Sequence, residues 1–95
     1  MNDQDVFDAL LRRAEGVARD VSGDFPETDT AFDLYVEELN GTLFGVIDMG
    51  DAYHEVFEWR DGEWDHAVVP DGQLATNYAF VIEDRILAQR RSSGY

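Results

Sequence analysis

Apolar residues recur with a helical period near the start of the chain. They stand at i, i+3 and i+4 spacing, with charged residues on the opposite side. The apolar stripe consists of Val6, Phe7, Leu10, Leu11, Ala14, Val17, Ala18 and Val21. This spacing predicts an amphipathic helix over residues 3–22 that covers a core. Gly23 is suited to cap its C-terminus, and Pro26 prevents the helix from continuing.

From residue 53 to residue 69 the period changes to two. The segment YHEVFEWRDGEWDHAVV alternates apolar and polar residues on either side of Asp61-Gly62. Such a dipeptide between two alternating runs is a strong signal for a β-hairpin with a two-residue turn. The turn predicts a register in which Trp59 faces Trp64. A three-residue turn would put the two tryptophans on opposite faces of the sheet, so we prefer the shorter one.

Two further runs, residues 31–39 and 42–49, flank Asn40-Gly41 and predict a second hairpin. A link of three residues joins it to the hairpin that follows, and this length brings the apolar faces of the two hairpins onto one side. Residues 31–69 are therefore predicted to form a four-stranded antiparallel meander.

The C-terminal segment, residues 73–91, fits two structures. Its Ala, Leu, Gln, Glu and Arg content favours a helix, and Arg90 and Arg91 suit the negative C-terminal end of one. The unbroken apolar run from Tyr78 to Ile82 would also suit a buried fifth strand. We prefer the helix. The result is a single α+β domain over residues 1–95, with two layers and the element order α-β-β-β-β-α.

Charge distinguishes this chain from an ordinary globular domain. It has 21 acidic and 7 basic residues, a net charge of −14, and every basic residue is arginine. Self-repulsion of this size destabilises a compact chain in dilute buffer, whereas at about 1 M salt the Debye length of about 3 Å screens most of it. The acids are scattered rather than blocked, and in this respect the composition resembles that of haloarchaeal cytoplasmic proteins. We expect a salt-adapted cytoplasmic protein; the alternative is an acidic protein that binds a basic partner or mimics nucleic acid.

Composition and missing motifs exclude several classes of function. The only basic cluster, Arg85, Arg90 and Arg91, is too small to favour nucleic-acid binding. There is no cysteine for a disulfide, a thiolate metal site or a nucleophile. No apolar run approaches the ~20 residues of a membrane span, and the acidic N-terminus lacks a signal-peptide pattern. Phosphate-binding glycine loops and the GxSxG and HExxH motifs are missing too, so we expect no cofactor and prefer a non-enzymatic protein.

One candidate site lies on the predicted core face of the sheet. Glu55 lies there among aromatic residues, with His66 diagonally across the strand pair, about 7–8 Å away and within reach of long side chains. A carboxylate and an imidazole in this arrangement can exchange protons, so Glu55 and His66 are the candidate catalytic pair. With Trp59 and Trp64 they would line an aromatic ligand pocket. The simpler alternative is that the tryptophans belong to the core and Glu55 reaches water at its rim.

A second candidate lies on the opposite, outer face. Asp33, Asp48 and His54 are predicted to form one transverse row across three strands, and two opposed carboxylates would be stabilised by a cation between them. Surface acids screened by salt are the simpler explanation. We therefore expect no metal site but keep these three residues as candidate ligands.

The outer face also carries an apolar row, which we call the outer row. A solvated sheet face should not hold so many apolar side chains, so either the C-terminal segment or another chain must cover them. The outer row consists of Tyr35, Phe44, Val46, Val56 and Ala67. We expect it to be the interface of a non-enzymatic interaction module that binds a protein partner or a second copy of itself. The alternatives are a ligand-binding domain or enzyme that uses the aromatic pocket, and a structural subunit of a larger assembly.

Overall fold

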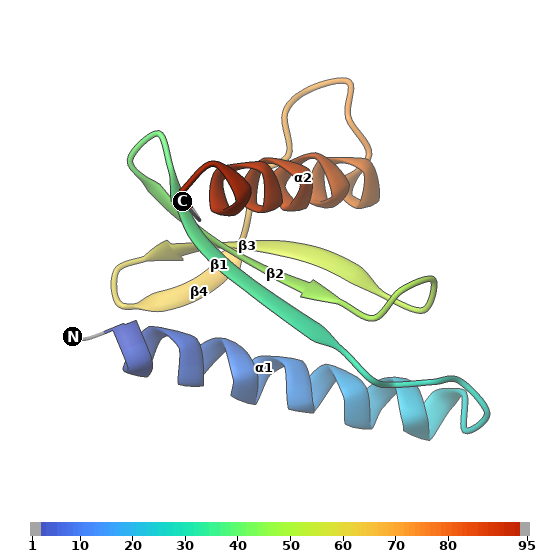
Figure 1. The fold of residues 1–95 in the computed structure, drawn as a ribbon. Helices are drawn as coiled ribbons and strands as arrows, with labels where there is room; N and C mark the ends of the chain where they lie inside the picture. Colours follow the sequence, from blue (N-terminus) through green and yellow to red (C-terminus); the bar gives the residue numbers. More distant parts are fainter. Residues whose placement is uncertain (1–2, 94–95) are drawn as a thin grey trace.

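The computed structural model of the chain describes residues 3–93 and consists of four strands between two helices (Figure 1). The elements are α1 (Asp3–Asp24), β1 (Asp33–Leu39), β2 (Thr42–Asp48), β3 (His54–Arg60), β4 (Glu63–His66) and α2 (Ala75–Ser93). The strands form one antiparallel sheet in the order β1-β2-β3-β4. The predicted α+β class and the order α-β-β-β-β-α are confirmed.

Both tight turns have the backbone geometry that their sequences predict. The first residue of each turn, Asn40 or Asp61, has a φ of 52°, and the glycine that follows has a φ of 85° or 83°. Two consecutive positive φ angles are the mark of a type I′ turn, whose twist matches that of the flanking strands. The predicted register is confirmed, because Trp59 pairs with Trp64.

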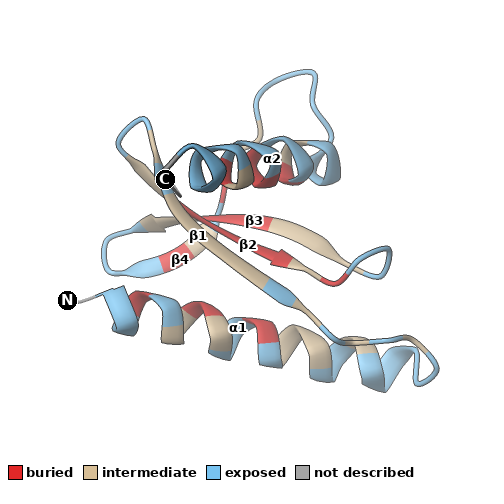
Figure 2. Cartoon of the chain, viewed as in Figure 1, coloured by how far each residue is buried: buried red, intermediate tan, exposed pale blue. Residues whose placement is uncertain are grey.

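The helix α1 covers one face of the sheet. Leu10 and Ala14 on its apolar stripe are fully buried, and Figure 2 shows its buried residues on the side toward the strands. The predicted helix over residues 3–22 is confirmed, but Gly23 is not its cap. The helix continues through Gly23 to Asp24. It ends there because Pro26 sterically disfavours helical backbone in the residue before it.

The core beneath α1 is closely packed around Gly45. A Cβ atom at this position would lie 2.9 Å from Leu10 Cδ2 and 2.9 Å from the Trp64 ring. Phe57 is 1% exposed, and the Trp64 indole donates a hydrogen bond of 3.0 Å to the Val6 carbonyl oxygen. Only a residue without a side chain fits between the helix and the tryptophan at this point.

The helix α2 covers the opposite face, so the domain has three layers rather than the predicted two (Figure 1). Ala79, Ile82 and Ile86 are at most 2% exposed and pack on the outer face of the sheet. The preferred helix in the C-terminal segment is confirmed, and the alternative of a fifth strand is wrong. Among the described helices, none is both long enough and apolar enough to cross a membrane.

The last strand is shorter than predicted. It ends at His66, although the Ala67 amide still donates to the Val56 carbonyl oxygen at 3.2 Å. The Val68 amide donates instead to the Glu58 carboxylate at 3.2 Å, and Val68 is 67% exposed. The start of β3 is therefore left without a neighbouring strand on that side.

Candidate functional site

The outer row lies beneath α2 and not on the surface. Val46 is fully buried, Val56 is 4% exposed, and Phe44 and Ala67 are 8% and 9% exposed. Tyr35 is half-buried at the margin of the same cluster. This corrects the expectation that these five residues form an interface, because the chain's own C-terminal helix covers them.

Two outward carbonyl groups of edge strand β1 accept hydrogen bonds from side chains of α2. Arg90 donates to the Val36 carbonyl oxygen at 3.0 Å, and Gln89 donates to that of Glu38 at 3.1 Å. An added strand would need these acceptors to pair with the edge. Because these carbonyl groups already accept hydrogen bonds from α2, pairing of another strand with β1 is disfavoured.

The outward carbonyl groups of edge strand β4 are bonded in the same way. Arg13 of α1 donates to the Trp64 carbonyl oxygen at 2.9 Å, and Arg60 donates to that of His66 at 2.8 Å. Both edges of the sheet therefore hold bonded acceptors. The open segment at the start of β3 lies just beyond the protected part of β4.

The two tryptophans pack against each other at the core beneath α1. Their rings meet edge to face with centroids 5.1 Å apart, and Trp64 is 3% exposed in the core under α1. The tryptophans contribute packing. Of the four residues predicted to surround an aromatic pocket, Glu55 and His66 line the cavity described below.

The predicted pair Glu55 and His66 does come together. The His66 Nδ1 atom and a Glu55 carboxylate oxygen form an ion pair when the imidazole is protonated. The His66 side chain is 67% exposed, while that of Glu55 is 25% exposed. The pair thus lies at the surface, where water competes for both groups.

A cavity of about 720 Å³ lies at this point. It is bounded by the start of β3, the end of β4 and the first turns of α2, and we call it the β3 groove. Its charged and aromatic lining consists of Asp51, Tyr53, His54, Glu55, His66 and Phe80. Because Asp51 and Phe80 are exposed, the groove is open to solvent.

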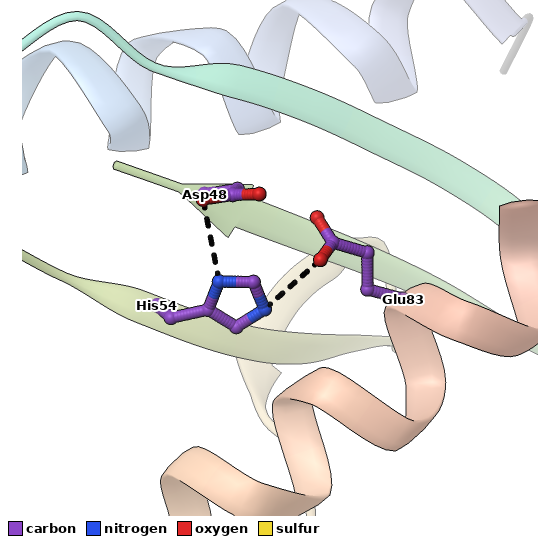
Figure 3. Close-up of side chains that lie close together, drawn as sticks. All are labelled: Asp48, His54 and Glu83. Atoms are coloured by element: carbon purple, nitrogen blue, oxygen red, sulfur yellow. Dashed lines mark ion pairs between the residues drawn. The ribbon is translucent and has the colours of Figure 1, made fainter. Parts of the chain in front are cut away.

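A second group of polar residues lies between the sheet and α2. Asp48 at the end of β2, His54 at the start of β3 and Glu83 on α2 point toward one another, as Figure 3 shows. One ligand atom from each residue lies within 4.8 Å of the other two, and we call this group the His54 cluster. The predicted row placed Asp48 and His54 together correctly. Asp33 pairs with Asp48 in the register but is not part of the cluster.

The imidazole of His54 is buried without a hydrogen bond. Its side chain is 2% exposed, and within residues 3–93 neither ring nitrogen has a hydrogen-bond partner. Nδ1 lies 3.4 Å from Asp48 Oδ1, and Nε2 lies 3.5 Å from Glu83 Oε1. These distances exceed the roughly 2.7–3.2 Å of an N–H···O hydrogen bond. The Phe80 ring stacks on the imidazole with centroids 4.2 Å apart and holds it between strand and helix.

The two carboxylates of the cluster have opposite pKa shifts. Burial, and then hydrogen bonding with Asp48 and its negative charge, raise the pKa of Glu83 to about 7. Burial also acts to raise the pKa of Asp48, but hydrogen bonds with Glu83 and the Gly50 amide, together with His54, lower it overall. Burial and the charges of Glu83, Asp33 and Asp48 raise the pKa of Tyr35 nearby. Burial is the largest cause acting on all three groups, and the neighbouring carboxylates add to it for Glu83 and Tyr35.

Glu83 is the member of the cluster that sequence reasoning missed. Its position depends on which face of the C-terminal helix meets the sheet, and that face was not assigned. A signal was present, because Ala79, Ile82, Glu83 and Ile86 follow the spacing of a single helical stripe. An acid within an apolar stripe marks a buried carboxylate that requires a partner.

Comparison with known proteins finds no matching family model, no similar curated protein and no similar solved structure.

Proposed function

We propose that the protein is a small binding domain whose β3 groove takes an organic cation with an apolar group, such as an aryl or alkyl amine. The observation that carries this proposal is the lining of the groove. Two carboxylates, of Asp51 and Glu55, and two aromatic rings, of Tyr53 and Phe80, line it beside the imidazoles of His54 and His66, while none of the seven arginines does. Acids and aromatic rings together suit an ammonium group attached to an apolar body.

The cation–aromatic attraction, the size of the cavity and the local charge all favour binding of such a ligand. A cation over an aromatic face gains about 0.5–1 kcal/mol at an exposed site and about 2 kcal/mol when desolvated. The volume of about 720 Å³ lies within the roughly 300–1,000 Å³ typical of small-molecule pockets. At about 1 M salt the net charge of −14 acts only over about 3 Å, so Glu55 and Asp51 must supply the attraction locally.

This proposal moves the predicted ligand pocket from the tryptophans to the open end of β3. It keeps Glu55 and His66 as binding residues and assigns them no catalytic role, because His66 is exposed to water. Interaction through the outer row is not proposed, since a partner could reach that surface only after α2 had left it.

The test compares three ligands of nearly equal shape and different charge: benzylamine, benzyl alcohol and benzoate. Thermal unfolding is measured in molar KCl with EDTA, for the wild type and for Glu55→Gln. A ligand at about 100 times its Kd stabilises a protein by about 2.7 kcal/mol, which a melting curve resolves readily. The matched control is Glu15→Gln, which removes one exposed carboxylate from α1, far from the groove.

We expect benzylamine to raise the melting temperature of the wild type and of Glu15→Gln, with a much smaller rise for Glu55→Gln. Benzyl alcohol and benzoate should have little effect. Equal shifts with all three ligands would mean non-specific apolar binding, and an equal benzylamine shift in all three proteins would remove Glu55 from the site. Either result would refute the proposal.

A further inference from the structure

The His54 cluster has a geometry that neither the fold nor the proposed groove requires. We infer that Asp48, His54 and Glu83 bind a divalent transition-metal ion such as Zn²⁺ between the sheet and α2. His54 and Phe80 also line the β3 groove, so the metal site adjoins the proposed amine site, but the metal inference does not rest on amine binding. The inference rests on the distances in the cluster, on the unbonded buried imidazole and on the chemistry of the three donors.

The distances suit a shared ion better than direct hydrogen bonds. Ligand atoms about 2.0–2.2 Å from a tetrahedral Zn²⁺ ion lie about 3.4 Å from one another. The His54 nitrogens lie 3.4 Å and 3.5 Å from their nearest carboxylate oxygens of Asp48 and Glu83. One nitrogen can bind the ion directly. The carboxylate oxygen nearest the other nitrogen can then hold the ring orientation, while the second oxygen of that carboxylate binds the ion.

Burial makes the unbonded imidazole significant. Proteins bond nearly all of their buried polar atoms, and the exceptions call for an explanation such as an ion. Within residues 3–93, both nitrogens of His54 and Oε2 of Glu83 are buried without a hydrogen-bond partner, and each nitrogen lies within ion-pair distance of a carboxylate, a pair that forms only if the ring is protonated. Figure 3 shows the two ring nitrogens directed to different neighbours, Nδ1 to Asp48 and Nε2 to Glu83. A metal ion bound to one ring nitrogen and to both carboxylates would satisfy that nitrogen and balance the charge of the carboxylates.

The donors select the class of ion. One imidazole nitrogen and two carboxylates form a mixed nitrogen and oxygen site, which suits Zn²⁺, Co²⁺ or Mn²⁺, whereas Mg²⁺ and Ca²⁺ prefer oxygen alone. The same preference excludes the abundant alkali cations of a salt-rich solution. Three protein ligands leave a position for water, as in other open zinc sites.

The origin of the ligands predicts a mechanical effect. Asp48 and His54 come from the sheet, while Glu83 comes from α2. An ion held by all three would connect α2 to the strands that it covers. Metal binding to the folded state alone must raise the melting temperature.

The test is a titration of the metal-free protein with Co²⁺ in molar KCl, followed by its visible d–d absorption, and then displacement by Zn²⁺. The variants His54→Ala, Glu83→Gln and Asp48→Asn each remove one donor, and circular dichroism establishes that each is folded. Glu83→Gln and Asp48→Asn are both isosteric, so if one of them fails to fold, the other still tests whether a carboxylate of the cluster binds the ion. The controls are His66→Ala, which removes the other histidine, and Asp33→Asn, which removes the acid opposite Asp48.

We expect one Co²⁺ ion per chain, displacement by Zn²⁺, and a melting temperature raised by both ions. His54→Ala should abolish the absorption, and Glu83→Gln should weaken binding at least tenfold. His66→Ala and Asp33→Asn should titrate like the wild type. Loss of binding in His66→Ala, unchanged binding in Glu83→Gln and Asp48→Asn, or no stoichiometric binding by the wild type would each overturn the assignment. The titration contains no amine and the amine test contains EDTA, so failure of one proposal can be told from failure of the other although His54 and Phe80 adjoin both sites.

Discussion

Replacing Val56 with glutamate tests whether α2 belongs where the structure places it. Val56 lies in the middle of the sheet, is 4% exposed and packs in the cluster that includes Ile82 and Ile86 of α2. Losing the buried valine costs about 1.5–3 kcal/mol, and burying an unpaired carboxylate costs several kcal/mol more. The sum approaches the whole stability of a small domain, about 5–15 kcal/mol. Val56→Glu should therefore unfold the protein or lower its stability by at least about 4 kcal/mol.

The assay is urea unfolding in molar KCl, followed by tryptophan fluorescence. Val68→Glu is the matched control, because Val68 is 67% exposed just past the end of β4 and should tolerate a charge. Light scattering on the same samples reports the oligomeric state. If Val56→Glu unfolds at the same urea concentration as Val68→Glu, α2 does not cover the sheet. If it converts a folded dimer into a folded monomer, the outer row is an intermolecular interface after all.

Four further predictions concern the backbone, the core and the charges. Gly62→Val should lower the free energy of unfolding by at least about 1 kcal/mol, because the φ of Gly62 is 83° and a β-branched residue is strained there. Chemical denaturation measures this change, and a neutral result would count against the two-residue turn. Gly45→Ala should cost about 1–3 kcal/mol, because its Cβ would lie 2.9 Å from both Leu10 and Trp64; an unchanged denaturation midpoint would show that this core is loose. The pKa of Glu83 is raised from 4.5 to about 7, so the folded state holds its proton more tightly than the unfolded state does. The free energy of unfolding of the metal-free protein should therefore fall by up to about 3 kcal/mol as the pH rises from 4.5 to about 7. Glu83→Gln should flatten this part of the curve of stability against pH, and an unchanged slope in that variant would contradict the pKa shift. Finally, the melting temperature should rise steeply between about 0.1 and 2 M KCl, because screening relieves the self-repulsion. Equal melting temperatures at both concentrations would refute salt adaptation.

The strand register was predictable because local chemistry determines it. Asn40 and Asp61 precede glycines, and each pair adopts the positive φ angles of a two-residue turn. Once the turns are set, side-chain alternation assigns every strand residue to a face. This reasoning placed Asp48 beside His54 and Glu55 near His66 without any tertiary information.

Long-range packing was harder to predict. The apolar content of the outer row indicated that something covers it, but composition alone could not choose between α2 and a second chain. The same uncertainty concealed Glu83, because a helix has to be docked before its inward residues are known. The β3 groove was also unforeseen, since it exists only because the chain leaves the sheet after Ala67.

The most direct test of the proposed function is to locate benzylamine by two-dimensional ¹H–¹⁵N NMR in molar KCl. Our account predicts that amide shifts change, with saturation, at Asp51, Tyr53, Glu55 and Thr76, which line the β3 groove. The amides of β1, at the other edge of the sheet, should remain unchanged. Shifts spread over the acidic surface without saturation, or shifts confined to residues outside the groove, would contradict the proposal that this cavity is the binding site.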